Sequence, residues 1–302
     1  MLRRGFTIIS SLVYVITSFA LSPNLYAATN SELVPGSRIV FPYYDLRPGF
    51  STFLFLTNVS TTPVSVNLEF YDASCDRLDT RIELSGRDVD ALDLADMISA
   101  DPSGNFRQGF VDVTTGADVL IGTAVVANTT DDWAIAYNGA SARRQEGGAT
   151  PFEPYPTDLV LPAFLTPGHI GGGVLADGLL IVAAPHPTRP GGKLSDTPIR
   201  TSAEILLRDE PTPSNRDRHR PHEMIRLSAG FNGHYLMLPM GTITGTPASP
   251  MLGWLSLTNH ATDKKGVPFG LVGLYIQTLV GPGSASVMAV RLSGDPSAAS
   301  SP

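Results

Sequence analysis

The stretch from Thr52 to Asp72, TFLFLTNVSTTPVSVNLEFYD, decides the fold. Residues 53–56 form an apolar run of strand length, and residues 58–63 are a cluster of turn-forming residues. Apolar and polar residues then alternate with a period of two, as in a strand with one buried and one solvated face. The stretch therefore predicts a hairpin of two antiparallel strands. The alternation places Val66, Leu68 and Phe70 on the core face, and Glu69 and Tyr71 toward solvent.

The same plan of two strands around a turn recurs at residues 122–137 and 253–276. In both, the first strand ends in an asparagine, Asn128 or Asn259. Asparagine suits a strand exit because its short amide bonds to nearby backbone and it tolerates a left-handed φ. Each of these segments is predicted to be a hairpin, which indicates an antiparallel all-β chain.

A longer internal repeat is indicated by two similar openings, RIVFP at Arg38–Pro42 and DLVLP at Asp158–Pro162. The segments Gly122–Asn128 and Gly253–Asn259 provide a second match between the two copies. Repeats of this length predict duplicated domains rather than a solenoid of short units. We therefore expect an all-β fold of two tandem immunoglobulin-like antiparallel β-sandwich units.

The expected boundaries follow from composition. The first sandwich unit covers residues 28–144 and the second covers residues 158–292, with a Pro- and Gly-rich linker at 145–157. Two long loops at 185–197 and 208–223 interrupt the second unit, and both are predicted to be exposed. The last residues, 293–302, are small and polar, and they are predicted to be a disordered tail.

The first 27 residues have the order of a secretory signal peptide. Arg3 and Arg4 precede an apolar run from Phe6 to Leu21, and small residues follow at the predicted cleavage site after Ala27. Cleavage after Ala20 is the alternative. The apolar run is shorter than the ~20 residues that a spanning helix needs, which disfavours an uncleaved anchor. The chain is therefore expected to be secreted, to the periplasm or the extracellular space, with no stable membrane span after signal removal.

Composition argues against two classes of partner and indicates that the chain can bury a hydrophobic core. The formal net charge is −7, and no basic run interrupts the acidic balance, so nucleic acid and anionic membrane surfaces are disfavoured as partners. Hydrophobic residues make up 42% of the chain, enough to bury a core. Cys75 is the single cysteine, so it forms no internal disulfide and no multi-thiolate metal site. We expect a partly exposed, unreactive thiol, with pairing to another chain as the alternative.

A family resemblance rests on strand and turn signals in residues 38–140. The segment VFPYYD at Val40–Asp45, the pair Ser51-Thr52, the turn Thr57–Ser60 and the alternating strand from Val64 to Tyr71 carry it. With these residues the chain resembles uncharacterised bacterial exported proteins with an immunoglobulin-like sandwich. The resemblance implies a fold and a compartment, and it implies no activity.

The sequence provides no motif for catalysis, a cofactor or a metal. Residues 49–53 lack the second glycine of a serine-hydrolase elbow, and His222-Glu223 is followed by Arg226 where a zinc protease has its second histidine. His219 and His222 are therefore interpreted as surface-loop residues, with adventitious metal binding as the alternative. The triple glycine at residues 171–173 is interpreted as a β-turn rather than a phosphate cradle.

The densest group of carboxylates is interpreted as a solvated strand edge that leads into a short helical turn. A calcium loop often places its carboxylates at alternate positions. Leu92 occupies the place that such a loop would give to the next carboxylate after Asp90, and calcium binding is the alternative kept open. The group consists of Asp88, Asp90, Asp93, Asp96 and Asp101.

These observations favour a non-catalytic exported module that binds or builds something in the cell envelope or outside it. Its partner is expected to be a protein or a surface, met through exposed loops or sheet edges. Two alternatives remain from the residues alone. One is a secreted or periplasmic hydrolase with a scattered site, for which paired carboxylates in one cleft would be the sign. The other is a subunit of a surface fibre assembled by strand exchange.

Overall fold

The computed structural model describes residues 33–99, 104–147, 150–188, 194, 200–208, 224–245, 251–282 and 284–294. The predicted signal at 1–27 and most of the two long loops lie outside these residues. So do His219, His222 and the last eight residues of the predicted tail. The first two tail residues, Ser293 and Gly294, form a short strand.

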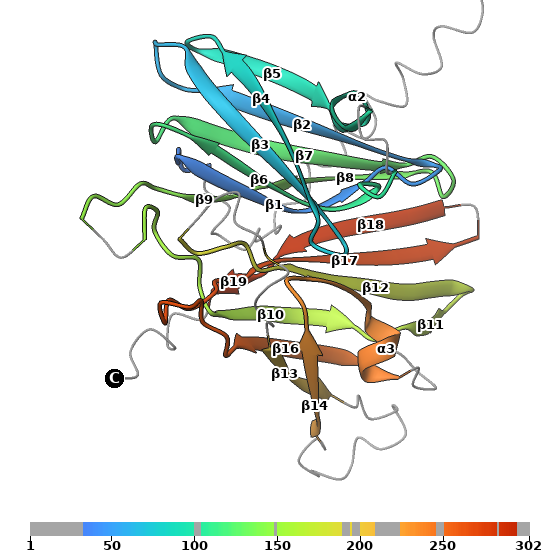
Figure 1. The fold of residues 1–302 in the computed structure, drawn as a ribbon. Coiled ribbons are helices and arrows are strands. Elements are labelled where there is room, and N and C mark those ends of the chain that lie inside the picture. Colours follow the sequence, from blue (N-terminus) through green and yellow to red (C-terminus); the bar gives the residue numbers. More distant parts are fainter. Residues whose placement is uncertain are drawn as a thin grey trace, which may run out of the picture. The chain divides into compact units, whose positions relative to one another are not determined.

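The first half of the described chain contains nine strands and one short helix (Figure 1). Their bounds are β1 Arg38–Asp45, β2 Phe50–Asn58, β3 Val64–Asp72, β4 Arg77–Leu84, β5 Asp88–Asp93, α2 Leu94–Ile98, β6 Gln108–Thr115, β7 Leu120–Asn128, β8 Trp133–Asn138 and β9 Ala140–Ala142. They form two antiparallel sheets. We call the sheet with order β5-β2-β7-β8 the β2 sheet, and the sheet with order β4-β3-β6-β1-β9 the β6 sheet.

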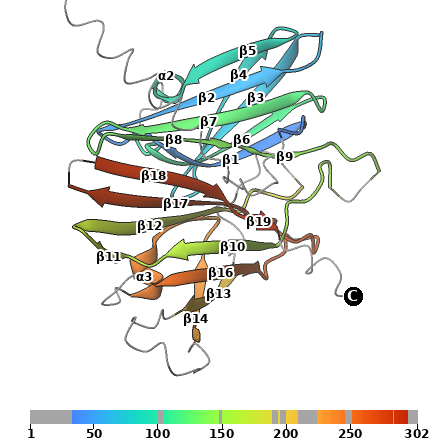
Figure 2. The same ribbon diagram turned by 180° about the vertical axis from the view of Figure 1, so that it is seen from behind.

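The second half forms two more antiparallel sheets (Figure 2). Its elements are β10 Asp158–Leu165, β11 Gly168–Gly171, β12 Val174–Ala183, β13 Arg200–Arg208, β14 Met224–Asn232, β15 Tyr235–Pro239, α3 Met240–Thr244, β16 Leu252–Asn259, β17 Val272–Gly281, β18 Ser284–Arg291 and β19 Ser293–Gly294. The β12 sheet has the order β11-β12-β17-β18, with β15 also paired to β12, and the β16 sheet has the order β14-β13-β16-β10-β19.

The all-β prediction is confirmed, but the prediction of two tandem immunoglobulin-like sandwiches is wrong. The four small sheets are arranged like the blades of a four-blade β-propeller. The sheets of the two halves also contact each other: β1 lies against β12 and β17, and β8 lies beside β18. One hydrophobic core cluster includes residues of all four sheets. Two separate sandwiches would instead each enclose a core of their own.

Two of the three predicted hairpins are connections between sheets. β2 pairs with β5 and β7, whereas β3 pairs with β4 and β6, so the turn at residues 59–63 joins two different sheets. The turn after β16 likewise leads to β17 in the other sheet of its half. The third prediction is confirmed, because β7 and β8 pair directly. In these two connections, the strands that were expected to be neighbours in one sheet lie in two different sheets. Their apolar faces therefore face each other across the core.

The asparagines at the strand exits act as predicted in both kinds of connection. The side-chain oxygens of Asn58, Asn128 and Asn259 accept hydrogen bonds from the backbone N–H two residues later, at 3.0, 2.9 and 3.0 Å. The Asn58 amide also donates to the carbonyl of Ser85, 2.9 Å away, and so ties the end of β2 to the end of β4. A local hydrogen bond of this kind satisfies a backbone N–H group of the turn. It does not determine which sheet the next strand joins.

The alternation in β3 is half confirmed. Val66, Leu68 and Phe70 are fully buried, as expected for the core face. Glu69 and Tyr71 were expected in solvent, yet they are only 3% and 1% exposed. The prediction of a wet face fails because the second half of the molecule packs against that side of the β6 sheet. The β1, β3 and β6 strands are therefore buried on both faces over much of their length.

The strand order of the first half is repeated in the second. β10 takes the place of β1, and β12 to β19 take the places of β2 to β9 in the same order, while β11 has no counterpart. The prolines Pro42 and Pro162 occupy equivalent sites, because the register of β1 and of β10 shifts at each. The second sequence match was wrong. It aligned β7 with β16, whereas β16 takes the place of β6.

Candidate functional site

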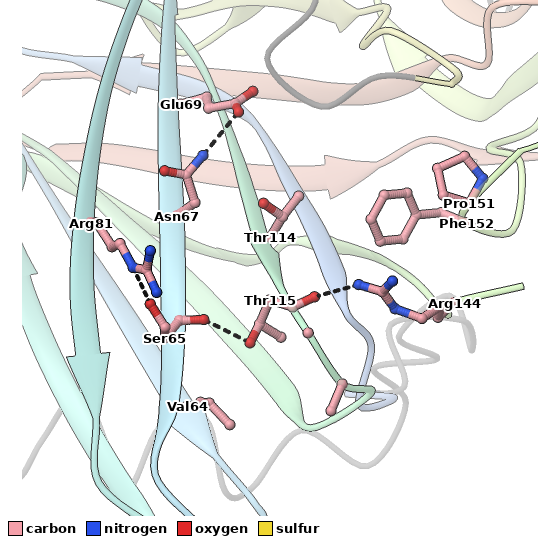
Figure 3. Close-up of a pocket in the computed structure, with 12 residues that line it drawn as sticks. Val64, Ser65, Asn67, Glu69, Arg81, Thr114, Thr115, Arg144, Pro151 and Phe152 are labelled. Carbon is pink, nitrogen blue, oxygen red and sulfur yellow. Dashed lines mark hydrogen bonds between the residues drawn. The ribbon is translucent and has the colours of Figure 1, made fainter.

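An open groove of about 710 Å³ lies on the outer face of the β6 sheet, the face turned away from the β2 sheet (Figure 3). β3, β4 and β6 provide its floor, and the segment after β9 provides one wall. Seven of the twelve residues that line the groove are polar or charged. The lining residues are Val64, Ser65, Asn67, Glu69, Arg81, Thr114, Thr115, Gly116, Ala117, Arg144, Pro151 and Phe152.

Strand register explains why these polar side chains gather. Directly opposed residues of an antiparallel pair project from the same face. Asn67 stands opposite Arg81 on one side and Thr114 on the other, and Glu69 stands opposite Asp112. The positions that the sequence marked as solvated therefore form one continuous polar strip across three strands.

Glu69 provides the buried carboxylate of the groove. It is 3% exposed and accepts hydrogen bonds from the Asn67 amide at 2.9 Å and the Tyr71 hydroxyl at 3.1 Å. Burial, together with the charge of Glu69, raises the pKa of Tyr71 far above its ordinary value, so this hydroxyl stays protonated and donates. The carboxylate, which itself lines the groove, is thus fixed in one orientation.

Beside the groove, on the same outer face of the β6 sheet, lies a buried ion pair between Arg38 and Asp112. The guanidinium meets the carboxylate with two hydrogen bonds of 2.9 and 2.6 Å, and the residues are 2% and 1% exposed. The rings of Phe152 and Tyr155 lie 5.5 Å from the Arg38 guanidinium. Burial alone would lower the pKa of Arg38, but Asp112 more than compensates and raises it. The Arg38 guanidinium therefore keeps its charge, and the pair is closed to solvent.

The wall of the groove carries a second guanidinium. Arg144 donates to the Thr115 carbonyl at 3.2 Å and lies 5.7 Å from the Phe152 ring. On the opposite side, Arg81 bonds to the Ser65 hydroxyl and is mostly exposed. The Thr115 hydroxyl donates to the Ser65 carbonyl at 2.9 Å. The two cations thus flank a strip of hydroxyl and amide groups, an arrangement that suits a polar ligand with negative charge.

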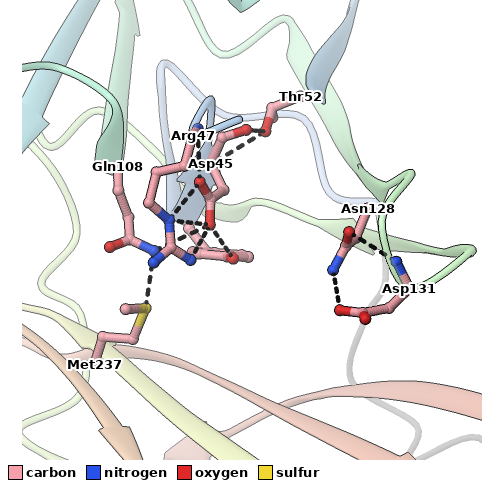
Figure 4. A network of polar contacts seen from close by, with 8 residues as sticks. Asp45, Arg47, Thr52, Gln108, Asn128, Asp131 and Met237 are labelled. Atoms are coloured by element: carbon pink, nitrogen blue, oxygen red, sulfur yellow. Dashed lines mark hydrogen bonds and ion pairs between the residues drawn. The ribbon is translucent and has the colours of Figure 1, made fainter. Parts of the chain in front are cut away.

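A second polar network centres on Asp45, at the end of β1 (Figure 4). This fully buried carboxylate accepts from the Tyr43 hydroxyl at 2.9 Å, from the Arg47 guanidinium at 2.6 Å and from the Gln108 amide at 3.1 Å. Gln108 also contacts the sulfur of Met237 on β15, 3.2 Å away. Through the contact of Gln108 with Met237, the network links strands of both halves. Both carboxylate oxygens of Asp45 already accept hydrogen bonds, so the network offers no open binding site.

The residues singled out in the sequence are not brought together. Asp88, Asp90 and Asp93 lie along β5, and the Asp93 carboxylate caps α2 by accepting from the Ala95 N–H at 2.9 Å. The strand edge followed by a helical turn is thus confirmed, and Asp101 lies outside the described residues. Within the described part, no three His, Cys, Asp or Glu side chains are grouped as a metal site would need.

The glycines at 171–173 form the tight turn between β11 and β12, with φ values of 110°, 60° and 78°, which confirms the β-turn. Cys75 is half-buried and free. Burial raises the pKa of its thiol to about 11, which fits the expected unreactive thiol. No helix in the described ranges is both long and apolar enough to cross a membrane.

The sequence did not reveal the groove, because the polar residues of β3 have the pattern of an ordinary solvent-exposed strand face. Asn67 and Glu69 have the same spacing in a solvated strand as in a lined groove. Arg144 comes from the segment after β9, and nothing local in its sequence points to β6. A charged residue opening an apolar strand, as Arg38 does in RIVFP, is the one signal that could have pointed to a buried partner.

Comparisons with known proteins leave the family open. No protein-family profile matches the chain, and no curated protein matches it. Among solved structures, the chain is similar to the Thermotoga maritima protein 1070, at 10% sequence identity and a TM-score of 0.31. The match covers 35% of this chain and 94% of that protein, and a likeness this weak indicates neither a function nor a fold.

Proposed function

We propose that the chain is an exported, non-catalytic binding module whose groove on the β6 sheet holds a hydroxyl-rich ligand with carboxylate groups, such as an acidic glycan. The observation that carries the proposal is the lining. Ser65, Asn67 and Thr114 offer hydroxyl and amide groups to a ligand's hydroxyls. Arg81 and Arg144 flank them, and guanidinium groups pair well with carboxylates.

The shape of the groove supports an extended ligand rather than a small enclosed one. The groove is open along the sheet, and its floor is held rigid by the hydrogen bonds of β3 with β4 and β6. Rigid, preorganised polar groups lose little conformational entropy when they bind. An oligosaccharide could lie across the strands and meet several of these groups at once.

Binding is favoured over hydrolysis by the count of carboxylates. Glycoside hydrolysis ordinarily uses two carboxyl groups that flank the bond to be cleaved. Glu69 is the one carboxylate among the residues that line the groove, and its cross-strand neighbour Asp112 is held in an ion pair by Arg38 beside the groove. This lining supports a module that holds its ligand unchanged.

The test is calorimetric titration of the purified chain with oligogalacturonate and with a neutral oligosaccharide of equal length. We expect binding of the acidic ligand only, weakened about tenfold or more by Arg144→Gln. Arg143→Gln is the matched control, since Arg143 is an exposed neighbour that does not line the groove. Equal binding of both ligands, or no effect of Arg144→Gln, would refute the charge argument. Chromatography of the ligand after incubation would reveal any cleavage and so favour the hydrolase.

A further inference from the structure

One part of the contact between the two halves of the chain is formed by two sheet faces. The Phe110 ring on β6 packs on Tyr235 of β15, with centroids 6.0 Å apart, and Gln108 contacts Met237. At the same interface, Arg38 donates to the carbonyl of His186 at 3.0 Å. The part of the outer face of the β6 sheet around Phe110 is therefore covered by the β12 sheet. The covering face is the one turned away from the β16 sheet, which we call the outer face of the β12 sheet.

The β16 sheet repeats the covered face of the β6 sheet. β16 takes the place of β6, and strand register then identifies equivalent positions. Phe110 stands opposite Tyr71, and Trp254 stands opposite Leu206. Gln108 stands opposite Asp45, and Leu252 stands opposite Leu165. Trp254 and Leu252 therefore occupy the places of the two residues that form the internal contact.

These equivalent positions are apolar and open. Leu252 is 41% exposed, and Trp254, Leu206 and Leu165 are half-buried. In the β6 sheet the same positions are buried beneath the other half, except Gln108, which is half-buried. The second half thus presents a more apolar version of the surface that the first half buries, with no described element to cover it.

The β2 sheet in turn repeats the covering face of the β12 sheet. α2 follows β5 after Asp93, which stands opposite Phe53, and α3 follows β15 after Pro239, which stands opposite Leu179. Counting back along β5 and β15 from these positions makes Val89 the equivalent of Tyr235. In the same way, Ala91 is the equivalent of Met237.

This face is also apolar and open. Val89 is 60% exposed and Phe55 is 38% exposed. They share the outer face with the half-buried Phe53, Ile121 and Val125. Exposed apolar residues that adjoin one another on a sheet face are typical of interaction sites.

We propose that copies of this chain associate head to tail, with the outer face of the β16 sheet of one copy against the outer face of the β2 sheet of the next. The partner is a second copy because each open face is the structural repeat of a face that already has a partner within the chain. The contact places Val89 of one copy on Trp254 of the other, as Tyr235 lies on Phe110. A contact between two different faces leaves one of each free, so assembly continues into chains or closed rings.

The test is sedimentation of the purified full chain over a range of concentrations. We expect the mean mass to rise with concentration beyond that of a dimer. Val89→Asp in one face and Leu252→Asp in the other should each weaken association about tenfold or more, because each puts a charge into an apolar contact. Val280→Asp is the control, since this valine is 47% exposed but belongs to neither face. Circular dichroism melts should show that all three variants fold.

Mixing the two variants separates this proposal from other modes of association. The Val89→Asp chain keeps an intact β16 face and the Leu252→Asp chain keeps an intact β2 face, so an equimolar mixture should form heterodimers and stop there. A native chain that stays monomeric at every concentration would overturn the proposal. So would association that Leu252→Asp leaves unchanged, or two variants that remain monomeric when mixed. If an aspartate variant fails to fold, Ala91→Glu replaces Val89→Asp, and Trp254→Ser replaces Leu252→Asp.

Discussion

The β6 and β16 sheets have the same strand order, yet their outer faces have opposite character. In the β6 sheet this face holds the buried Arg38–Asp112 pair, Glu69 and the stacked rings of Phe110 and Tyr71. In the β16 sheet the equivalent face carries Trp254 and is open. The face with more charge is thus the buried one.

This difference shows that burial of a strand face is decided by what packs on it and not by its polarity alone. Charged groups are tolerated inside when each has a partner, and Asp112 and Arg38 satisfy each other with two hydrogen bonds. The apolar face of the β16 sheet lacks a cover within the described residues. Substitutions at equivalent positions of the two sheets can therefore test whether the comparison holds.

The largest effect is expected at the aromatic position. Phe110→Ala removes a fully buried ring stacked on Tyr71 at 4.7 Å, and it should lower the free energy of unfolding by about 3–5 kcal/mol. Trp254→Ala at the equivalent position should cost about 1 kcal/mol in a dilute monomer, since that ring is only half-buried. Urea unfolding curves of both variants measure the difference. Equal losses would mean that the two faces are equally covered.

The next effect is expected at the ion pair. Asp112→Asn leaves the Arg38 guanidinium buried without a countercharge and should cost about 3 kcal/mol. Ser256 is the equivalent residue, because it stands opposite Val160 as Asp112 stands opposite Val40. Ser256→Ala should stay within ~0.5 kcal/mol. The double variant Arg38→Met with Asp112→Leu provides the control. If it is as unstable as Asp112→Asn, shape rather than charge dominates.

The same faces explain how far the sequence could predict the fold. Period-two alternation correctly identified strands and the inward direction of Phe70, because these depend on neighbours along the strand. The partner of a strand depends on residues far along the chain. The segments ending in Asn58 and in Asn128 look alike, but the first leads to another sheet and the second to a hairpin. A turn motif satisfies local backbone groups in either case.

The candidate groove had the same limit. Asn67 and Glu69 were visible as polar residues of one strand face, but they become a site only when Arg144 provides a wall. No local pattern links positions so far apart in the chain. The prediction that Glu69 faces solvent failed for the same reason, because burial by the second half leaves no mark on the sequence of β3.

A moderate effect is expected at Glu69. Glu69→Ala removes the acceptor of the Asn67 amide and the Tyr71 hydroxyl, and a buried donor left unpaired costs about 1–3 kcal/mol. Glu204 is its equivalent on β13, since it stands opposite Ser256. Glu204 is half-exposed, so Glu204→Ala should stay within ~0.5 kcal/mol. Glu69→Gln should restore part of the stability by accepting again. The reverse order of the two losses in denaturant melts would contradict the assignment of covered and open faces.

The smallest effect concerns the rim of the covered face, where Cys75 reports whether the two halves stay together. Burial raises the pKa of its thiol from 9.0 to about 11, and the backbone of His234 and Tyr235 offsets part of that rise. Only the thiolate reacts with an alkylating agent, and the thiolate fraction falls tenfold for each unit of pKa. Alkylation at pH 7.5 should therefore be roughly a hundredfold slower in the folded chain than in urea, and its rate should rise with pH until about pH 11.

In Phe110→Ala, which loosens the packing beside Tyr235, the titration midpoint of the Cys75 thiol should move back toward 9, while Trp254→Ala should leave it in place. A midpoint near 9 in the unmodified chain would show that solvent reaches the thiol freely and that the face counted as covered is open at its rim.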